Sequence, residues 1–225
     1  MDEHKGESEM RFVKKKGSSP SFKSFVHAVE SPTEIRDLFK KWCESKGGEY
    51  ESKPTRQSCV FESEFGYLDE AVVRDFYDFI RQHKPLLDKL EGWANTLAIS
   101  SENKLIGGYR EGVDVEYIPP ERRFYITALF YSDYGEPTGE PVYEKIPLKK
   151  KVEGVLPWSA ELEVEDNEAT WEWMGVADVW ASMPFHEASP DKLAKAAEEA
   201  AEIASDFANE AREELLKPVE EEEAW

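Results

Sequence analysis

The stretch RRFYITALFYS, residues 122–132, is the strongest strand signal in the chain. It is almost entirely aromatic, β-branched or small and apolar, and such residues favour strands. Weaker strand patterns lie on both sides of it, at 113–117, 142–148, 160–165 and 170–183. Because these segments follow one another without a helical pattern between them, we expect them to pair antiparallel.

Helical patterns flank this strand-rich region. Ser31-Pro32 begins one helix and Gly47-Gly48 ends it. Asp69 caps a second helix, which we expect Pro85 to break or kink. Ser189-Pro190 begins a third helix, whose apolar positions are mostly alanine. Such a face allows close approach to a neighbour but buries little area per residue.

The order of these elements from residue 57 to 217 is one strand, one helix, about six strands and one helix. This order resembles the helix-grip architecture, in which a curved antiparallel sheet wraps a long carboxy-terminal helix. We therefore predict an α+β protein with an antiparallel sheet of about six to seven strands, N-terminal helices and a long alanine-rich C-terminal helix. The predicted parts are a flexible arm (1–24), an α+β domain (25–187), a helix that packs on the domain or in a dimer (188–217) and an acidic tail (218–225).

The composition indicates a folded, strongly acidic protein. The net charge is −20, and hydrophobic residues make up 40 % of the 225 residues, enough for a core. Such a charge disfavours binding to nucleic acid or anionic membranes unless basic residues cluster locally. The polar, acidic start and the lack of a long apolar run predict a cytoplasmic protein without a membrane partner.

The common catalytic and cofactor-binding motifs are absent from the sequence. We therefore predict no catalytic residue, metal or cofactor. Asp114 and Glu116 place two acids on one face of a strand, where they could bind a divalent cation or simply form its wet side. The two cysteines, Cys43 and Cys59, could close a disulfide but are too few for a tetrahedral zinc site.

Basic and aromatic residues coincide around the central strand. Rings of this kind stack on bases of single-stranded nucleic acid, and cations follow its phosphates. The alternative is a core of aromatic residues with ordinary charges at the sheet edge, where lysines prevent edge-to-edge pairing. The predicted contact residues are Arg110, Arg122, Arg123, Phe124, Tyr125, Lys149, Lys150 and Lys151.

The last nine residues, KPVEEEEAW, resemble the acidic, aromatic-ended tails of some single-strand DNA-binding proteins. That resemblance implies a tail that docks a protein partner and competes with DNA for a basic groove. The alternative is a solvated terminus. The residues concerned are Glu220, Glu221, Glu222, Glu223 and Trp225.

Three functional hypotheses follow. The first is a non-catalytic binding or assembly protein, forming a homo-oligomer if the alanine-rich helix pairs with its copy. The second is a single-stranded nucleic-acid-binding protein with a partner-recruiting tail. The third is a ligand carrier or enzyme with a cavity between the sheet and the C-terminal helix.

Overall fold

The computed structural model describes residues 33–90, 96–104, 110–135, 148–167 and 172–215. The α-helices are α2 (Thr33–Ser45), α3 (Glu70–Leu87) and α4 (Pro190–Leu215), with the short 3₁₀ helices η3 (Pro119–Glu121) and η4 (Phe185–Glu187). The strands are β1 (Glu49–Lys53), β2 (Arg56–Glu62), β3 (Thr96–Lys104), β4 (Arg110–Ile118), β5 (Arg123–Gly135), β6 (Leu148–Glu153), β7 (Pro157–Asn167) and β8 (Glu172–Pro184). The predicted arm (1–24) and acidic tail (218–225) lie outside the described residues.

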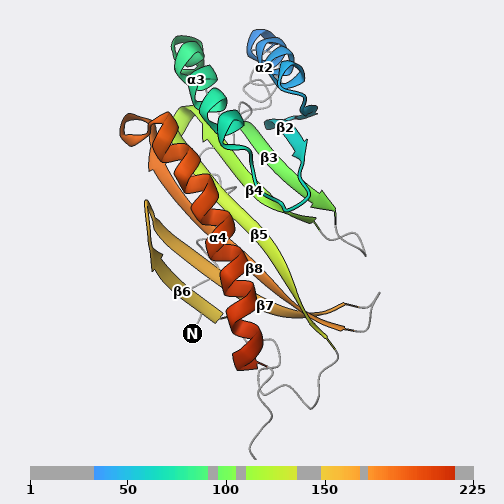
Figure 1. The fold of residues 1–225 in the computed structure, drawn as a ribbon. Helices are drawn as coiled ribbons and strands as arrows, with labels where there is room; N and C mark the ends of the chain where they lie inside the picture. Colours follow the sequence, from blue (N-terminus) through green and yellow to red (C-terminus); the bar gives the residue numbers. More distant parts are fainter. Residues whose placement is uncertain (1–32, 91–95, 105–109, 136–147, 168–171, 216–225) are drawn as a thin grey trace, which may run out of the picture.

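All eight described strands form one sheet, in the order β1-β2-β3-β4-β5-β8-β7-β6 (Figure 1). The α+β class, the mostly antiparallel sheet and the long C-terminal helix are confirmed. The strand count is eight rather than six or seven, because the sequence EYESK of β1 gives no strand signal. Four of its five side chains are exposed at the sheet edge, so no apolar alternation marks it.

One pair of strands is parallel. β2 runs parallel to β3, and α3 connects them, as a parallel pair requires a long crossover. From β3 onward every described pair is antiparallel, as the close spacing of the strand patterns predicts.

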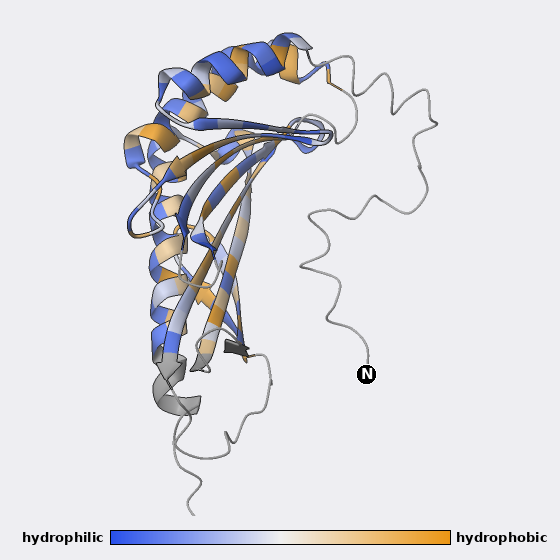
Figure 2. Cartoon of the chain, turned by 90° about the vertical axis from the view of Figure 1, so that its right-hand side faces the viewer, coloured by the Kyte–Doolittle hydropathy of each residue, from blue (hydrophilic) through white to orange (hydrophobic). Residues whose placement is uncertain are grey.

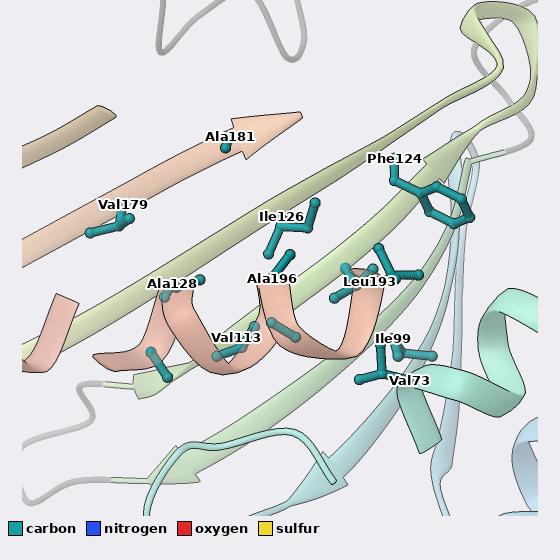
Figure 3. Close-up of a cluster of buried hydrophobic side chains, with 14 of the residues drawn as sticks. Val73, Ile99, Val113, Phe124, Ile126, Ala128, Val179, Ala181, Leu193 and Ala196 are labelled. Carbon is teal, nitrogen blue, oxygen red and sulfur yellow. The ribbon is translucent and has the colours of Figure 1, made fainter. Parts of the chain in front are cut away.

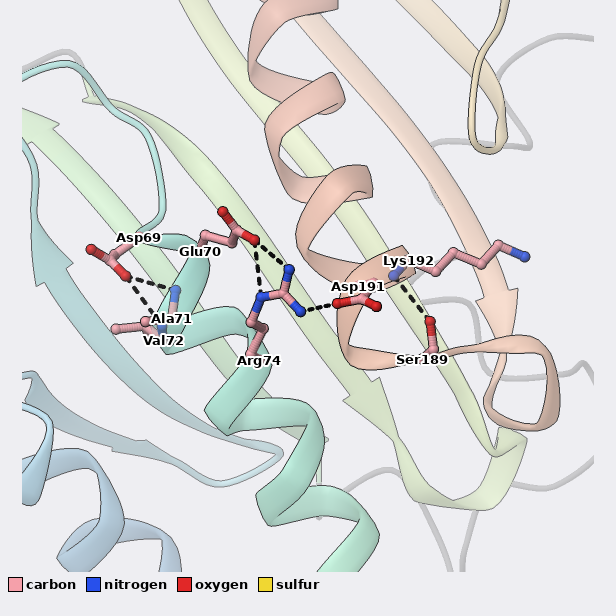
Figure 4. A network of polar contacts seen from close by, with 8 residues as sticks. All are labelled: Asp69, Glu70, Ala71, Val72, Arg74, Ser189, Asp191 and Lys192. Atoms are coloured by element: carbon pink, nitrogen blue, oxygen red, sulfur yellow. Dashed lines mark hydrogen bonds and ion pairs between the residues drawn. The ribbon is translucent and has the colours of Figure 1, made fainter.

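The helix ends follow from local chemistry. Gly47 has a φ of 79°, the left-handed conformation that ends α2. The side chain of Asp69 accepts hydrogen bonds from the first amides of α3, and the backbone N–H of Lys192 donates to Ser189 Oγ at 3.1 Å (Figure 4). Arg74 then joins the two helix starts, since its guanidinium pairs with Glu70 and with Asp191 (Figure 4).

Of the two outcomes predicted for Pro85, a break or a kink, the break is wrong. α3 continues through Pro85 to Leu87. Proline removes one backbone hydrogen bond near the end of the helix, and that loss is offset by packing, because Leu87 is fully buried. The Nζ of Lys84 also lies 2.5 Å from Asp88, across the last turn.

The core lies between the sheet and the helices. α4 packs across β5 and β8, with α3 beside it (Figure 1). Figure 3 shows Leu193 and Ala196 of α4 facing Ile126 and Val113 of the sheet. In the part of α4 whose burial is described, residues 190–209, the buried alanines are Ala194, Ala196, Ala197, Ala200, Ala201, Ala204 and Ala208. These buried alanines, the alanine seam, therefore pack within the protein's own fold and are not available to a second copy.

We expect Ala200→Leu to lower the free energy of unfolding by about 1–3 kcal/mol, because Ala200 is fully buried and a larger side chain would push α4 off the sheet. Urea unfolding measures this change. Lys195→Leu, at an exposed position of the same helix, is the matched control and should change stability by less than about 0.5 kcal/mol. Equal effects of the two substitutions would contradict the packing described here.

A disulfide joins α2 to the sheet. Cys43 of α2 and Cys59 of β2 are bonded, with 5.5 Å between their Cα atoms, and both are fully buried. Gly48 lies against this bond, since a Cβ at that position would be 2.4 Å from the Cys59 sulfur. The close approach explains why glycine occupies the position after the helix-ending Gly47.

Candidate functional site

The two faces of the sheet differ. The three described α-helices lie on one side, and no described helix or strand covers the other, which we call the open face (Figure 2). Successive strand residues point to opposite faces, so Phe124 and Ile126 face the helices whereas Tyr125 and Thr127 lie on the open face. The open face is therefore the available surface of the sheet in the part of the chain that the structure describes.

A hollow of about 390 Å³ lies on this face. β1 to β5 and β8 contribute its lining, which is mostly polar. Five carboxylates and three cations line it: Glu51, Glu102, Glu111, Asp114, Asp178, Lys53, Arg56 and Arg110. Its floor is already removed from water, since Ser58, Ser101 and Thr127 are 5 %, 5 % and 8 % exposed.

Arg56 is the organising residue of the hollow. Its Nη2 lies 2.9 Å from Oδ2 of Asp114 and its Nη1 lies 2.8 Å from Oε1 of Glu116. Its Nε donates to Ser58 Oγ at 3.0 Å, and Nη2 lies 3.5 Å from Ser100 Oγ. Burial tends to lower the pKa of Arg56, but the two carboxylates raise the pKa above its ordinary value. The cation is thus held in place by the strands beside it.

The structure adds a partner to the face that Asp114 and Glu116 share, and Asp114 remains about a third exposed on it. They share a face, as predicted, but they bind the guanidinium of Arg56, and Glu116 is only 3 % exposed. The sequence did not reveal this network because Arg56 lies 58 residues before Asp114. The only local signal is Arg56 itself, a basic residue at the start of β2. Among the described residues, no group of three His, Cys, Asp or Glu is arranged to hold a metal.

The backbones of Ser101 in β3 and Gly112 in β4 approach each other closely in one wall of the hollow. A Cβ on Gly112 would lie 2.0 Å from the carbonyl oxygen of Ser101, so only glycine fits there. Ser101 Oγ accepts a hydrogen bond from the Val113 N–H at 2.8 Å and donates to the carbonyl of Gly66 at 2.5 Å. This side chain ties β3, β4 and the loop after β2 together and fixes the shape of the wall.

The predicted nucleic-acid contact residues are divided among different places. Arg110 lies in the hollow, paired with Glu102 at 2.7 Å. Arg122 lies at the other end of β4, in the turn before β5, with its Nε 3.6 Å from Asp88. These two arginines therefore do not contribute to one groove.

Besides Arg110, four of the eight residues lie on the open face. Arg123 and Tyr125 lie on β5, where Arg123 Nη1 donates to Ser182 Oγ at 3.0 Å. Lys149 and Lys151 lie on the edge strand β6. Lys151 of β6 pairs with Ser159 of β7, and Ser159 pairs with the half-buried Trp180 of β8. Lys151 and Trp180 therefore lie on one line across these three strands. Lys149 is not available as a free cation, because Glu161 lies 3.1 Å from it.

Two members of the predicted set are on the wrong face. Phe124 is fully buried and stacks among Tyr77, Tyr117 and Phe185, so its ring belongs to the core and cannot stack on a base. Lys150 also faces the helices, with its Nζ 4.4 Å from the ring centre of Phe207 in α4. The physical reason is strand alternation, which sends neighbouring residues to opposite sides of the sheet.

The remaining predictions concern α4 and the tail. The hollow lies on the opposite face of the sheet from α4, so it is not the cavity between sheet and helix that the third hypothesis needs. The seam proposed for a homo-oligomer through α4 is buried against β5 and β8. Glu220–Glu223 and Trp225 lie outside the described residues.

Comparison with known proteins assigns no relative to this chain. No protein-family model, curated protein or solved structure matches it. None of the described helices is both long and apolar enough to cross a membrane.

Proposed function

We propose that this protein is a non-catalytic binding protein whose binding surface is the open face of the sheet, centred on the hollow around Arg56. One observation carries the proposal. All three described α-helices cover one face of the sheet, while the other has a hollow with a desolvated floor. A hollow whose walls are held by hydrogen bonds needs little reordering to bind a ligand.

The charges of the hollow favour a cationic partner. Its carboxylates outnumber its cations, and two of the three cations, Arg56 and Arg110, are already paired with acids. The half-buried rings of Tyr125 and Trp180 lie beside it on the same face. A peptide that carries both basic and aromatic side chains has the chemistry to meet both groups.

Single-stranded nucleic acid is the second candidate. The observation that favours it is the shared placement of Arg123, Tyr125, Lys149 and Lys151 on the open face. The carboxylates of the hollow and the pairing of Lys149 with Glu161 oppose it, since phosphates would be repelled there.

The test is a titration of the full-length protein with a fluorescently labelled lysine- and phenylalanine-rich peptide. We expect binding that weakens with salt, and we expect Glu51→Gln with Glu102→Gln to weaken it about tenfold, or about 1.4 kcal/mol. Glu198→Gln with Glu202→Gln removes two exposed acids from α4 and is the matched control, with less than about a twofold effect on Kd expected.

Labelled oligo-dT is titrated in parallel at about 50 mM and about 200 mM salt. Salt-sensitive binding of oligo-dT together with no binding of the peptide would contradict the proposal and favour the second candidate. Equal weakening by both pairs of Glu→Gln substitutions would also contradict it, because attraction would then come from the net charge alone.

A further inference from the structure

A basic segment stands out in this acidic chain. Residues 11–29, RFVKKKGSSPSFKSFVHAV, contain five lysines or arginines and no aspartate or glutamate. They also contain three phenylalanines. The segment therefore has the combination of basic and aromatic side chains that the hollow and the neighbouring rings of the open face would recognise.

We propose that residues 11–29 of the same chain bind on the open face and cover the hollow, so that the protein regulates its own binding site. The inference rests on the proposed function. It goes beyond that proposal by naming the occupant of the site in the free protein and by making any external partner a competitor of this segment.

The connection between the segment and the hollow is short. Residue 29 lies four residues before α2, which begins at Thr33 and packs on β1 and β2. β1 is the edge strand, and Glu51 and Lys53 of β1 line the hollow. The described chain therefore begins in a helix that packs on the edge strand β1, one of the strands that line the hollow.

The segment is also long enough. Nineteen extended residues span about 60 Å, whereas eight strands about 4.8 Å apart span less than about 40 Å. Because the segment is tethered, its effective concentration at the hollow is of the order of millimolar. Even a weak affinity of residues 11–29 for the hollow is then sufficient for the segment to occupy the hollow of its own chain.

Zero-length carbodiimide cross-linking of the unmodified full-length protein tests the contact. We expect amide bonds between Lys14, Lys15 or Lys16 and the hollow residues Glu51, Glu102 or Glu111, in the monomer band and suppressed by about 1 M salt. The exposed acids Glu198 and Glu202 of α4 are the internal control. Cross-links to α4 as frequent as those to the hollow, or cross-links between chains only, would overturn the proposal.

Competition tests the regulation. The full-length variant Lys14→Glu, Lys15→Glu and Lys16→Glu should bind an added peptide of sequence 11–29 about tenfold more tightly than the wild type does. Circular dichroism verifies that the variant is folded. If the variant and the wild type bound the added peptide with equal affinity, the proposal that residues 11–29 occupy the hollow would be overturned, while the proposed function would stand. Absence of peptide binding to both proteins would overturn the two proposals together.

Discussion

Replacing Arg56 with methionine is expected to lower the free energy of unfolding by about 3–5 kcal/mol. The side chain of Arg56 is 21 % exposed and that of Glu116 only 5 %. Methionine preserves much of the aliphatic stem but removes the cation, so the Glu116 carboxylate remains buried without its ion pair. The loss is large because removing one member of a buried ion pair costs more than the pair contributes.

Guanidinium chloride unfolding followed by tryptophan fluorescence measures this effect. The double variant Arg56→Met with Glu116→Gln is the control, since it removes the stranded charge, and we expect it to be more stable than Arg56→Met alone. A loss below about 1 kcal/mol for the single variant would show that the guanidinium is as weakly coupled as a surface ion pair.

The variant Cys43→Ala with Cys59→Ala is expected to lose about 3 kcal/mol of stability. The two residues are 16 apart in the sequence, and closing a loop of this length restricts the unfolded chain by about that amount. For a protein of this size the corresponding fall in Tm is about 6–12 °C. Calorimetry with and without reductant measures it.

The reductant supplies the control. Dithiothreitol should lower the Tm of the wild type but leave the double variant unchanged. Two free thiols in the untreated protein, detected by mass spectrometry, would contradict the bond between α2 and β2.

Local features of the fold were predictable from the sequence, whereas long-range pairing was not. Asp69 and Ser189 cap their helices as expected, because a cap depends on residues two or three positions away. β1 was missed because its mostly exposed residues show no apolar alternation. The parallel pairing of β2 with β3 was missed because nothing near β2 in the sequence specifies a partner about 40 residues later.

The error at Phe124 was avoidable. Phe124 and Tyr125 are neighbours in a strand, so they could not both face the same groove. The alternation in RRFYITALFYS places Phe124, Ile126 and Ala128 on one side, and all three are buried. The hollow was not predictable in this way, because its lining comes from six strands distributed over 128 residues, from Glu51 to Asp178.

The most direct test of the open face as the binding surface is to map amide chemical shifts of the full-length protein during titration with the lysine- and phenylalanine-rich peptide. We expect the largest changes in and beside the hollow, at Ser58, Ser100 and Asp114. Changes concentrated at Glu198 and Glu202 of α4, with the hollow unaffected, would contradict the account.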